Sequence, residues 1–332
     1  MDATDGLSIL LAYDMEGVSG LDNWRMFDAN FPEYERGREL LTGDVNAVVA
    51  GLFAGGATRV DLVDFHGSGS NNPDVLLEEI DGRARHVERD SVFWEFDLVE
   101  AGAYDAVVVV GVHCKPGSGG FAPHTCGYGM ELLVNGQTIT EAEWQALLWG
   151  EVGVPLILVS GDDRLAGDLS TLPWIGYVAV KTATSASSVI LRPLDDAHAE
   201  LEAAASRAVK NLDNSRAIAV RAPVEVGVRA NPPTSLEALN GVPGVDYRDG
   251  TVFFEAPSLV AAGRGLNAVL GVASASLAPI AYEMLDSLMG FEPSLRVFYT
   301  KVSERWLDFQ SGTWAPEPGD SSVTQRIYYG AQ

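Results

Sequence analysis

The chain has 332 residues and 47% of them are hydrophobic, which is typical of one large or two ordinary packed domains and excludes a disordered protein. Its formal net charge of −24, from 46 acidic and 22 basic residues, disfavours binding to nucleic acid or to an anionic membrane. Two cysteines are too few for a disulfide scaffold.

The chain shows no sign of a targeting or membrane segment. No apolar run approaches the roughly 20 residues of a membrane span, and the first residues, MDATDG, lack the basic region of a secretory signal. We therefore expect a cytoplasmic protein with reduced thiols and with neither nucleic acid nor membrane as a partner.

Four aliphatic runs predict buried parallel strands, because they are β-branched and each ends in polar residues. They are residues 7–14 (LSILLAYD), 58–66 (TRVDLVDFH), 105–113 (DAVVVVGVH) and 154–163 (VPLILVSGDD). Residues 33–57 lie between the first two runs and have apolar side chains at helical spacing before a Gly-Gly stop. Residues 140–153 predict another helix before the fourth run. This alternation predicts an α/β fold with a parallel sheet.

The pattern changes at about residue 174. A strand and turn at 175–185 and an alanine-rich helix at 195–212 are followed by two strand-like segments at 222–230 and 245–257 and a small-residue helix at 259–285. We predict an α/β metal-binding catalytic domain over 1–173, a smaller α+β domain over 174–289 and a C-terminal arm over 290–332.

Polar side chains with metal-binding chemistry follow three of the predicted strands. Asp14 and Glu16 end the first run, His66 ends the second and His113 ends the third. Because parallel strands deliver their next residues to the same sheet edge, we expect these side chains to converge in one crevice. Taken singly, an Asp or His at a strand end is more often an ordinary turn or loop residue, so the prediction rests on their joint placement.

Two further residues belong to this candidate site. His124 lies in a glycine-rich loop just after His113, and Glu141 begins the helix before the fourth strand, where it either enters the crevice or favours the helix N-terminus. Carboxylate and imidazole ligands suit zinc, manganese or a similar ion. A shared carboxylate can bridge two ions about 3.5 to 4 Å apart, and such pairs hydrolyse amides. The residues alone therefore favour a metal-dependent hydrolase.

For other polar residues near the expected crevice, the sequence leaves two alternative roles open. Lys181, after an apolar run, would either orient a substrate carboxylate or pair with an acidic neighbour. Asp162, Asp163 and Arg164 either enter the crevice or cap the next segment. Cys114 and Cys126 are predicted to be small packing residues rather than ligands.

The chain resembles the zinc-dependent D-aminopeptidases, a family of self-compartmentalising peptidases of the dipeptide-transport-operon type. The resemblance covers roughly residues 8–280 and rests on motifs in the family's order and approximate spacing: DMEGVSG, EYERGR, DFHGSGSNN, GVHCKPG, PHTCGYG, GDDR and AVKTATS. It implies ring-shaped homo-oligomers, commonly decameric, that release N-terminal D-amino acids from short peptides or amides.

The resemblance also implies roles for the site residues. It places two Zn²⁺ ions per subunit, with Asp14 as the bridge, Glu16 and His66 completing one ion and His113 and Glu141 the other. It makes His124 the catalytic residue, as nucleophile or general base. Glu143 is close enough in sequence to be confused with Glu141, but only one of them can point inward from a helix.

We therefore predict a two-zinc aminopeptidase that removes the N-terminal residue, a D-amino acid, by metal-activated water with a catalytic histidine. The first alternative is a two-zinc amidase acting on a non-peptide amide or an L-amino-acid derivative. The second is a non-catalytic binding protein that metal ions stabilise.

Overall fold

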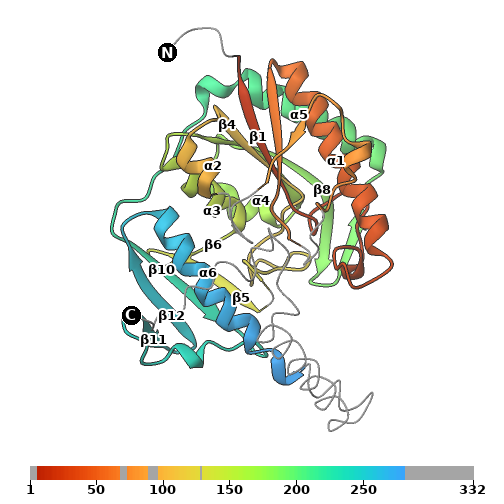
Figure 1. Cartoon of the computed structure of the whole chain (residues 1–332). Helices are drawn as coiled ribbons and strands as arrows, with labels where there is room; N and C mark the ends of the chain where they lie inside the picture. The colour runs from red at the N-terminus through yellow and green to blue at the C-terminus, as the bar shows by residue number, and fades with distance from the viewer. Residues whose placement is uncertain (1–5, 68–72, 89–95, 128, 281–332) are drawn as a thin grey trace, which may run out of the picture. The chain divides into compact units, whose positions relative to one another are not determined.

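The computed structural model describes residues 6–67, 73–88, 96–127 and 129–280. The chain divides into two units, Met1–Ser276 and Leu277–Gln332. The first unit contains the assigned helices and strands (Figure 1). The predicted C-terminal arm, 290–332, lies outside the described residues.

A seven-stranded sheet in the order β3-β2-β1-β4-β7-β8-β9 forms the larger part of the first unit. Every neighbouring pair in it is parallel except β8 and β9, which are antiparallel. The strands are β1 Ser8–Tyr13, β2 Arg59–Asp64, β3 Arg85–His86, β4 Ala106–Val110, β7 Leu156–Asp162, β8 Gly176–Ser185 and β9 Ser188–Leu191. The four predicted parallel strands are confirmed as β1, β2, β4 and β7.

Both faces of this sheet are buried, and β1 shows why its sequence has no polar alternation. Ile9 and Leu11 belong to the core that contains Val45 and Leu201 of the helices, whereas Leu10 belongs to a second core with Trp144 on the other face. A strand buried on both faces reads as one continuous hydrophobic run.

Helices α1 (Tyr34–Gly55) and α5 (Leu194–Lys210) pack side by side on one face of the sheet (Figure 1). A Cβ atom at Gly51 of α1 would lie 2.1 Å from the Glu202 carbonyl oxygen of α5. Glycine is therefore required at this point for the two helices to approach so closely.

A second sheet is antiparallel, with five strands in the order β11-β12-β10-β5-β6. Its strands are β5 Met130–Val134, β6 Gln137–Ile139, β10 Val224–Ala230, β11 Asp246–Arg248 and β12 Thr251–Ala256. Helix α6 (Leu259–Ala275) packs on β10 and β12 (Figure 1).

The remaining helices are short or flank the sheets. They are α2 Phe96–Ala101, α3 Glu141–Gly150, α4 Leu165–Asp168 and the 3₁₀ helices η1 Trp24–Met26, η2 Leu77–Glu79, η3 Leu169–Thr171, η4 Leu212–Asn214 and η5 Glu237–Leu239.

The two sheets do not divide at residue 173, where the sequence pattern placed a domain boundary. Strands β8 and β9 and helix α5 complete the large parallel sheet, and β5 and β6 belong to the small antiparallel one. The physical reason is non-local pairing: β5 bonds with β10, about 90 residues later in the chain, and no local pattern encodes that choice.

One described helix, Leu259–Ile280, is long and apolar enough to cross a bilayer by length and composition alone. The expectation that no segment would approach this length and composition is therefore wrong. In the fold 44% of its most apolar window is buried, and Leu259, Leu266 and Leu270 of α6 belong to the core. Core helices of folded domains pass the same test, so this feature alone is weak evidence for a membrane span.

Candidate metal centre and active site

The carboxyl ends of three adjacent strands deliver the candidate ligands to one place. Asp14 directly follows β1, His66 lies just beyond β2 and His113 just beyond β4, and β1 lies between the other two. Sheet geometry therefore brings the three chain segments together, as the sequence pattern predicted.

The turn after β1 is held tightly against the end of β4. The Asp14 amide donates to the Val110 carbonyl at 2.8 Å, and the Gly17 amide donates to the Gly111 carbonyl at 2.7 Å. A Cβ atom at Gly17 would lie 2.2 Å from the Val112 carbonyl oxygen. The glycine of the DMEG motif thus lets the turn approach β4 and fixes the backbone between Asp14 and Val18.

The candidate ligands form two groups that share Asp14. In one group a ligand atom from each of Asp14, Glu16 and His66 lies within 4.8 Å of the others, and in the second the same holds for Asp14, His113 and Glu141. The individual distances are 3.5 Å from His66 Nε2 to Glu16 Oε1, 3.6 Å from His113 Nε2 to Asp14 Oδ2 and 3.4 Å from His113 Nε2 to Glu141 Oε1.

This cluster fits divalent metal ions on its own geometry. Asp14 and Glu16 are each only 2% exposed. Asp14 Oδ2 and Glu16 Oε2 are buried with no hydrogen-bond partner among the described residues. Buried carboxylate oxygens without a partner are costly unless a cation satisfies them. Carboxylate oxygens and imidazole nitrogens are ligands that zinc accepts.

Glu141, and not Glu143, faces the cluster. Its Oε1 accepts a hydrogen bond from the Cys126 amide at 2.6 Å and lies near His113. Glu143 instead forms a capping box with Thr140: the Thr140 amide donates to Glu143 Oε2 at 2.8 Å, and the Glu143 amide donates to Thr140 Oγ1 at 3.0 Å. The two carboxylates therefore have separate tasks, one in the cluster and one at the start of α3.

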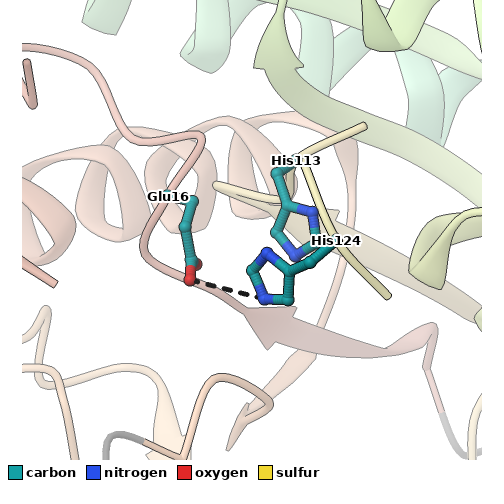
Figure 2. A group of neighbouring side chains, drawn as sticks. All are labelled: Glu16, His113 and His124. Carbon is teal, nitrogen blue, oxygen red and sulfur yellow. Dashed lines mark ion pairs between the residues drawn. The ribbon is translucent and has the colours of Figure 1, made fainter. Parts of the chain in front are cut away.

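His124 stacks on His113 at the same site. The ring centroids are 3.8 Å apart with the planes inclined by 12°, and Figure 2 shows the two rings face to face with Glu16 opposite. His124 Nδ1 lies 2.8 Å from the Ala122 carbonyl oxygen. Because a carbonyl only accepts, Nδ1 carries the proton in the neutral ring, and the lone pair is then on Nε2, which lies 3.8 Å from Glu16 Oε1.

The loop that carries His124 has unusual backbone conformations. Ala122 and Cys126, which flank His124, have φ angles of 45° and 65°. Residues other than glycine seldom adopt positive φ, and such strain concentrates at functional sites. Asp162 stabilises the same loop, since its Oδ2 accepts from the Phe121 amide at 2.7 Å while Oδ1 accepts from Arg164 and Leu165 at the start of α4.

Burial and close charges shift the titration of the cluster. Burial and then Glu16 raise the pKa of Asp14 well above its usual range. Burial opposes the charged forms of Glu16 and His66, but their mutual attraction lowers the pKa of Glu16 and raises that of His66. Burial likewise opposes charge on His113, but Glu141, together with Asp14 and Glu16, outweighs it and raises the pKa of His113 to about 10. Without metal, protons on imidazoles balance the carboxylates, so metal ions must displace them and bind more weakly as pH falls.

The pKa of His124 moves in the opposite direction. Burial, and then the positive charge of His113, lower the pKa of His124 below its usual value. His124 is therefore a neutral imidazole at pH 7, in the form that can accept a proton.

In the part of the chain that the structure describes, Lys181 binds backbone carbonyls rather than an acidic side chain. It is 1% exposed, and its ammonium donates to three backbone carbonyls of the turn after β1, those of Glu16 at 2.5 Å, Val18 at 3.0 Å and Leu21 at 2.9 Å. The Phe121 ring also covers the ammonium, with 4.8 Å between Lys181 Nζ and the ring centroid. Lys181 thus fixes the backbone that carries Glu16.

Lys181→Met should lower the free energy of unfolding by about 3 kcal/mol or more, because it leaves three buried carbonyls without their donor. Thermal unfolding of the variant measures this. Lys210→Met is a matched control, since Lys210 is exposed and donates only to Ser206. Equal melting temperatures for the two variants would contradict the role assigned to Lys181.

The cluster opens into a cavity of about 260 Å³. Besides the five candidate ligands and His124, its lining consists of Phe27, Asp28, Asn30, Phe65, Gly67, Cys126 and Gly127. None of these described lining residues is lysine or arginine. Apart from the candidate ligands and His124, the described part of the cavity is therefore lined by two aromatic rings, those of Phe27 and Phe65, and by a single carboxylate, that of Asp28.

Comparisons with known proteins agree with this geometry. The chain is 26% identical over 265 residues to a D-aminopeptidase of Bacillus subtilis strain 168, covering 77% of this chain and 94% of that one. Its fold matches the structure described as the Zn-dependent D-aminopeptidase DppA from Bacillus subtilis, a self-compartmentalizing protease, with a TM-score of 0.74 and 25% identity over 81% of this chain and 98% of that one. The model of the M55 peptidase family, described as D-aminopeptidase, matches residues 7–268. The chain therefore belongs to the D-aminopeptidase family.

Proposed function

We propose that this zinc-dependent D-aminopeptidase holds two zinc ions per subunit, with Asp14 shared between them. One ion would bind Glu16 and His66, and the other His113 and Glu141. The supporting observation is that Asp14 belongs to both three-residue groups while its Oδ2 has no hydrogen-bond partner among the described residues. Zinc supplies Lewis acidity, which lowers the pKa of water and polarises a scissile carbonyl.

The protein's own residues provide the proton transfer. His124 enters the reaction neutral, with Nδ1 fixed by the Ala122 carbonyl and Nε2 facing the cluster. Nε2 can take a proton and return it to the leaving amine, as a general base and then a general acid. Stacking on His113 holds the ring in this orientation. Covalent attack by His124 on the carbonyl is the other mechanism compatible with this placement.

With zinc neutralising the ligand carboxylates, the remaining carboxylate of the cavity offers a way to select a free N-terminus. Asp28 lines the cavity and is the one carboxylate among the described lining residues that belongs to neither ligand group. Its Oδ1 accepts from the Asn30 amide at 2.9 Å and from the Asn30 side chain at 2.8 Å, which orients the carboxylate. We assign Asp28 to binding the substrate's α-ammonium group.

Asp28→Asn should raise KM for a free dipeptide about tenfold or more and leave kcat nearly unchanged, since a charge-assisted hydrogen bond contributes roughly 1.5–3 kcal/mol. Steady-state kinetics measure the change. Asp213→Asn removes an exposed carboxylate of η4 and serves as the control for net charge. An unchanged KM in Asp28→Asn would exclude this assignment.

The assembly is also part of the proposal. The solved relative is described as self-compartmentalizing. We propose that this chain likewise forms a closed homo-oligomer, a ring of ten subunits. We also propose that the protein is cytoplasmic. A cavity reached through such a ring would admit short peptides only. Light scattering coupled to size exclusion measures the mass, and a stable monomer with full activity would contradict the proposal.

The activity is tested by comparing two substrates. Metal-free protein loaded with zinc should release D-alanine from D-Ala-D-Ala, and much less L-alanine from L-Ala-L-Ala. Release from the L-peptide alone would favour an amidase or peptidase for L-amino-acid derivatives. Two bound zinc ions without release from either peptide or from amide derivatives would favour the non-catalytic alternative.

A further inference from the structure

A buried carboxylate outside the two ligand groups contacts one of their histidines. Asp74 is fully buried, and its Oδ2 lies 2.8 Å from His66 Nδ1. The opposite nitrogen of the same ring, Nε2, lies 3.5 Å from Glu16 Oε1. The His66 ring therefore lies between a supporting carboxylate on one side and the cluster on the other.

This contact determines which nitrogen of His66 carries the proton. An ionised carboxylate only accepts hydrogen bonds, so Nδ1 must be the donor to Asp74. In the neutral ring the lone pair is then on Nε2, which faces Glu16 and the cluster. Without a partner at Nδ1, a neutral imidazole exchanges between two tautomers and its ring orientation is not fixed.

Asp74 is itself held by a network of hydrogen bonds from α1 and from Asp64. The Tyr34 hydroxyl donates to Asp74 Oδ1, and the Asp74 amide donates to Asp64 Oδ2 at 2.9 Å. Arg38 donates to the Asp74 carbonyl at 3.1 Å and to the carbonyls of Pro73 and Val75 at 3.2 Å each. Tyr34 and Arg38 are four residues apart at the start of α1, so one face of this helix fixes the segment that carries Asp74.

We infer that Asp74, held by Tyr34, is a positioning residue. It orients His66 so that Nε2 can bind the zinc ion that Asp14 and Glu16 would also bind. This inference rests on the proposed metal site. Residues that orient a metal-bound imidazole typically contribute 10- to 100-fold to metal affinity. Asp74 should therefore affect one of the two zinc ions and leave the other, held by His113 and Glu141, unchanged.

The test is a competitive zinc titration of the full chain and its variants with a chromophoric chelator. We expect Asp74→Asn and Asp74→Leu to weaken one zinc-binding step 10- to 100-fold, with the leucine variant at the upper end, and to leave the other step as in the wild type. Tyr34→Phe should weaken the same step less, because it removes only the support of Asp74.

Asp61→Asn is the matched control for a general loss of stability. Asp61 is equally buried and lies on β2, the strand before His66, but it binds Arg59, Arg85 and Tyr104 outside the cluster. It should lower the melting temperature and leave both zinc affinities unchanged. Equal zinc affinities in the wild type and in both Asp74 variants, or the same loss in Asp61→Asn, would overturn the inference.

A spectroscopic measurement keeps the inference testable if Asp74→Leu folds poorly. In zinc-loaded wild-type protein, a His66 Nδ1 proton should be protected from exchange and shifted downfield in the NMR spectrum, and Asp74→Asn should move this signal upfield. A wild-type protein without such a proton would overturn the inference. If wild-type protein with two bound zinc ions did not hydrolyse D-peptides, the proposed function would be overturned, whereas the inference about Asp74 would stand.

Discussion

His124→Gln should lower kcat by about 10²- to 10⁴-fold, the usual contribution of a general acid or base, while both of the proposed zinc ions stay bound. The imidazole belongs to neither of the groups that share Asp14, and its Nε2 faces Glu16 at 3.8 Å. Glutamine keeps comparable size and polarity but cannot exchange a proton at this position. Steady-state kinetics on a D-dipeptide, with zinc counted by atomic absorption, measure both quantities.

His198→Gln is the matched control for this variant. His198 lies on α5, partly exposed, and contacts Asp44 at 3.1 Å rather than the cluster. Its replacement should leave kcat unchanged. A kcat of His124→Gln within tenfold of the wild type would contradict the assignment. A covalent adduct on His124 in rapidly quenched wild-type protein would identify it as the nucleophile rather than the general base.

Glu141→Gln should lose one of the two proposed zinc ions and reduce turnover by more than about 100-fold, the upper cost of changing a residue that only supports a ligand. The reason is that Glu141 Oε1 lies 3.4 Å from His113 Nε2 and that Glu141 supplies one of the three carboxylates of the two groups that share Asp14. The number of zinc ions per subunit and kcat are measured on the same preparation.

The chain offers a close control two residues away. Glu143→Gln keeps the capping box with Thr140, because glutamine serves equally at this position, so stability and zinc content should both stay close to those of the wild type. Opposite results for the pair, with zinc lost in Glu143→Gln and kept in Glu141→Gln, would contradict the assignment of the two carboxylates.

The sequence predicted the parts of the fold that depend on local pattern. The continuous apolar runs became β1, β2, β4 and β7, because strands buried on both faces need side chains that are apolar throughout. The convergence of the candidate metal ligands followed from the same reasoning, since parallel strands place Asp14, His66 and His113 at one edge whatever the details of their loops.

The division between the sheets could not be predicted in this way. Strands β5 and β6 form a hairpin at Asn135-Gly136, whose positive φ angles of 50° and 76° suit a tight turn. That dipeptide is a strong hairpin signal between alternating hydrophobic residues. The hairpin itself was therefore readable from the sequence, whereas its partner β10 is about 90 residues away and follows from packing alone.

The supporting residues of the site were harder to identify than the ligands. Lys181 binds backbone carbonyls, which have no sequence signature, and Asp74 contacts His66 from a segment without regular secondary structure. Both contacts depend on how the folded chain passes around the cluster. Lys181 stands out in the sequence as a charge after an apolar run, but the roles of both residues depend on burial and hydrogen bonds that the fold defines.

The most direct test of a two-zinc site centred on Asp14 is anomalous diffraction from zinc-loaded crystals on both sides of the zinc absorption edge. We predict two anomalous peaks, one among Asp14, Glu16 and His66 and the other among Asp14, His113 and Glu141, with Asp14 bound to both ions. A single peak, or peaks away from these residues in fully active protein, would contradict the account.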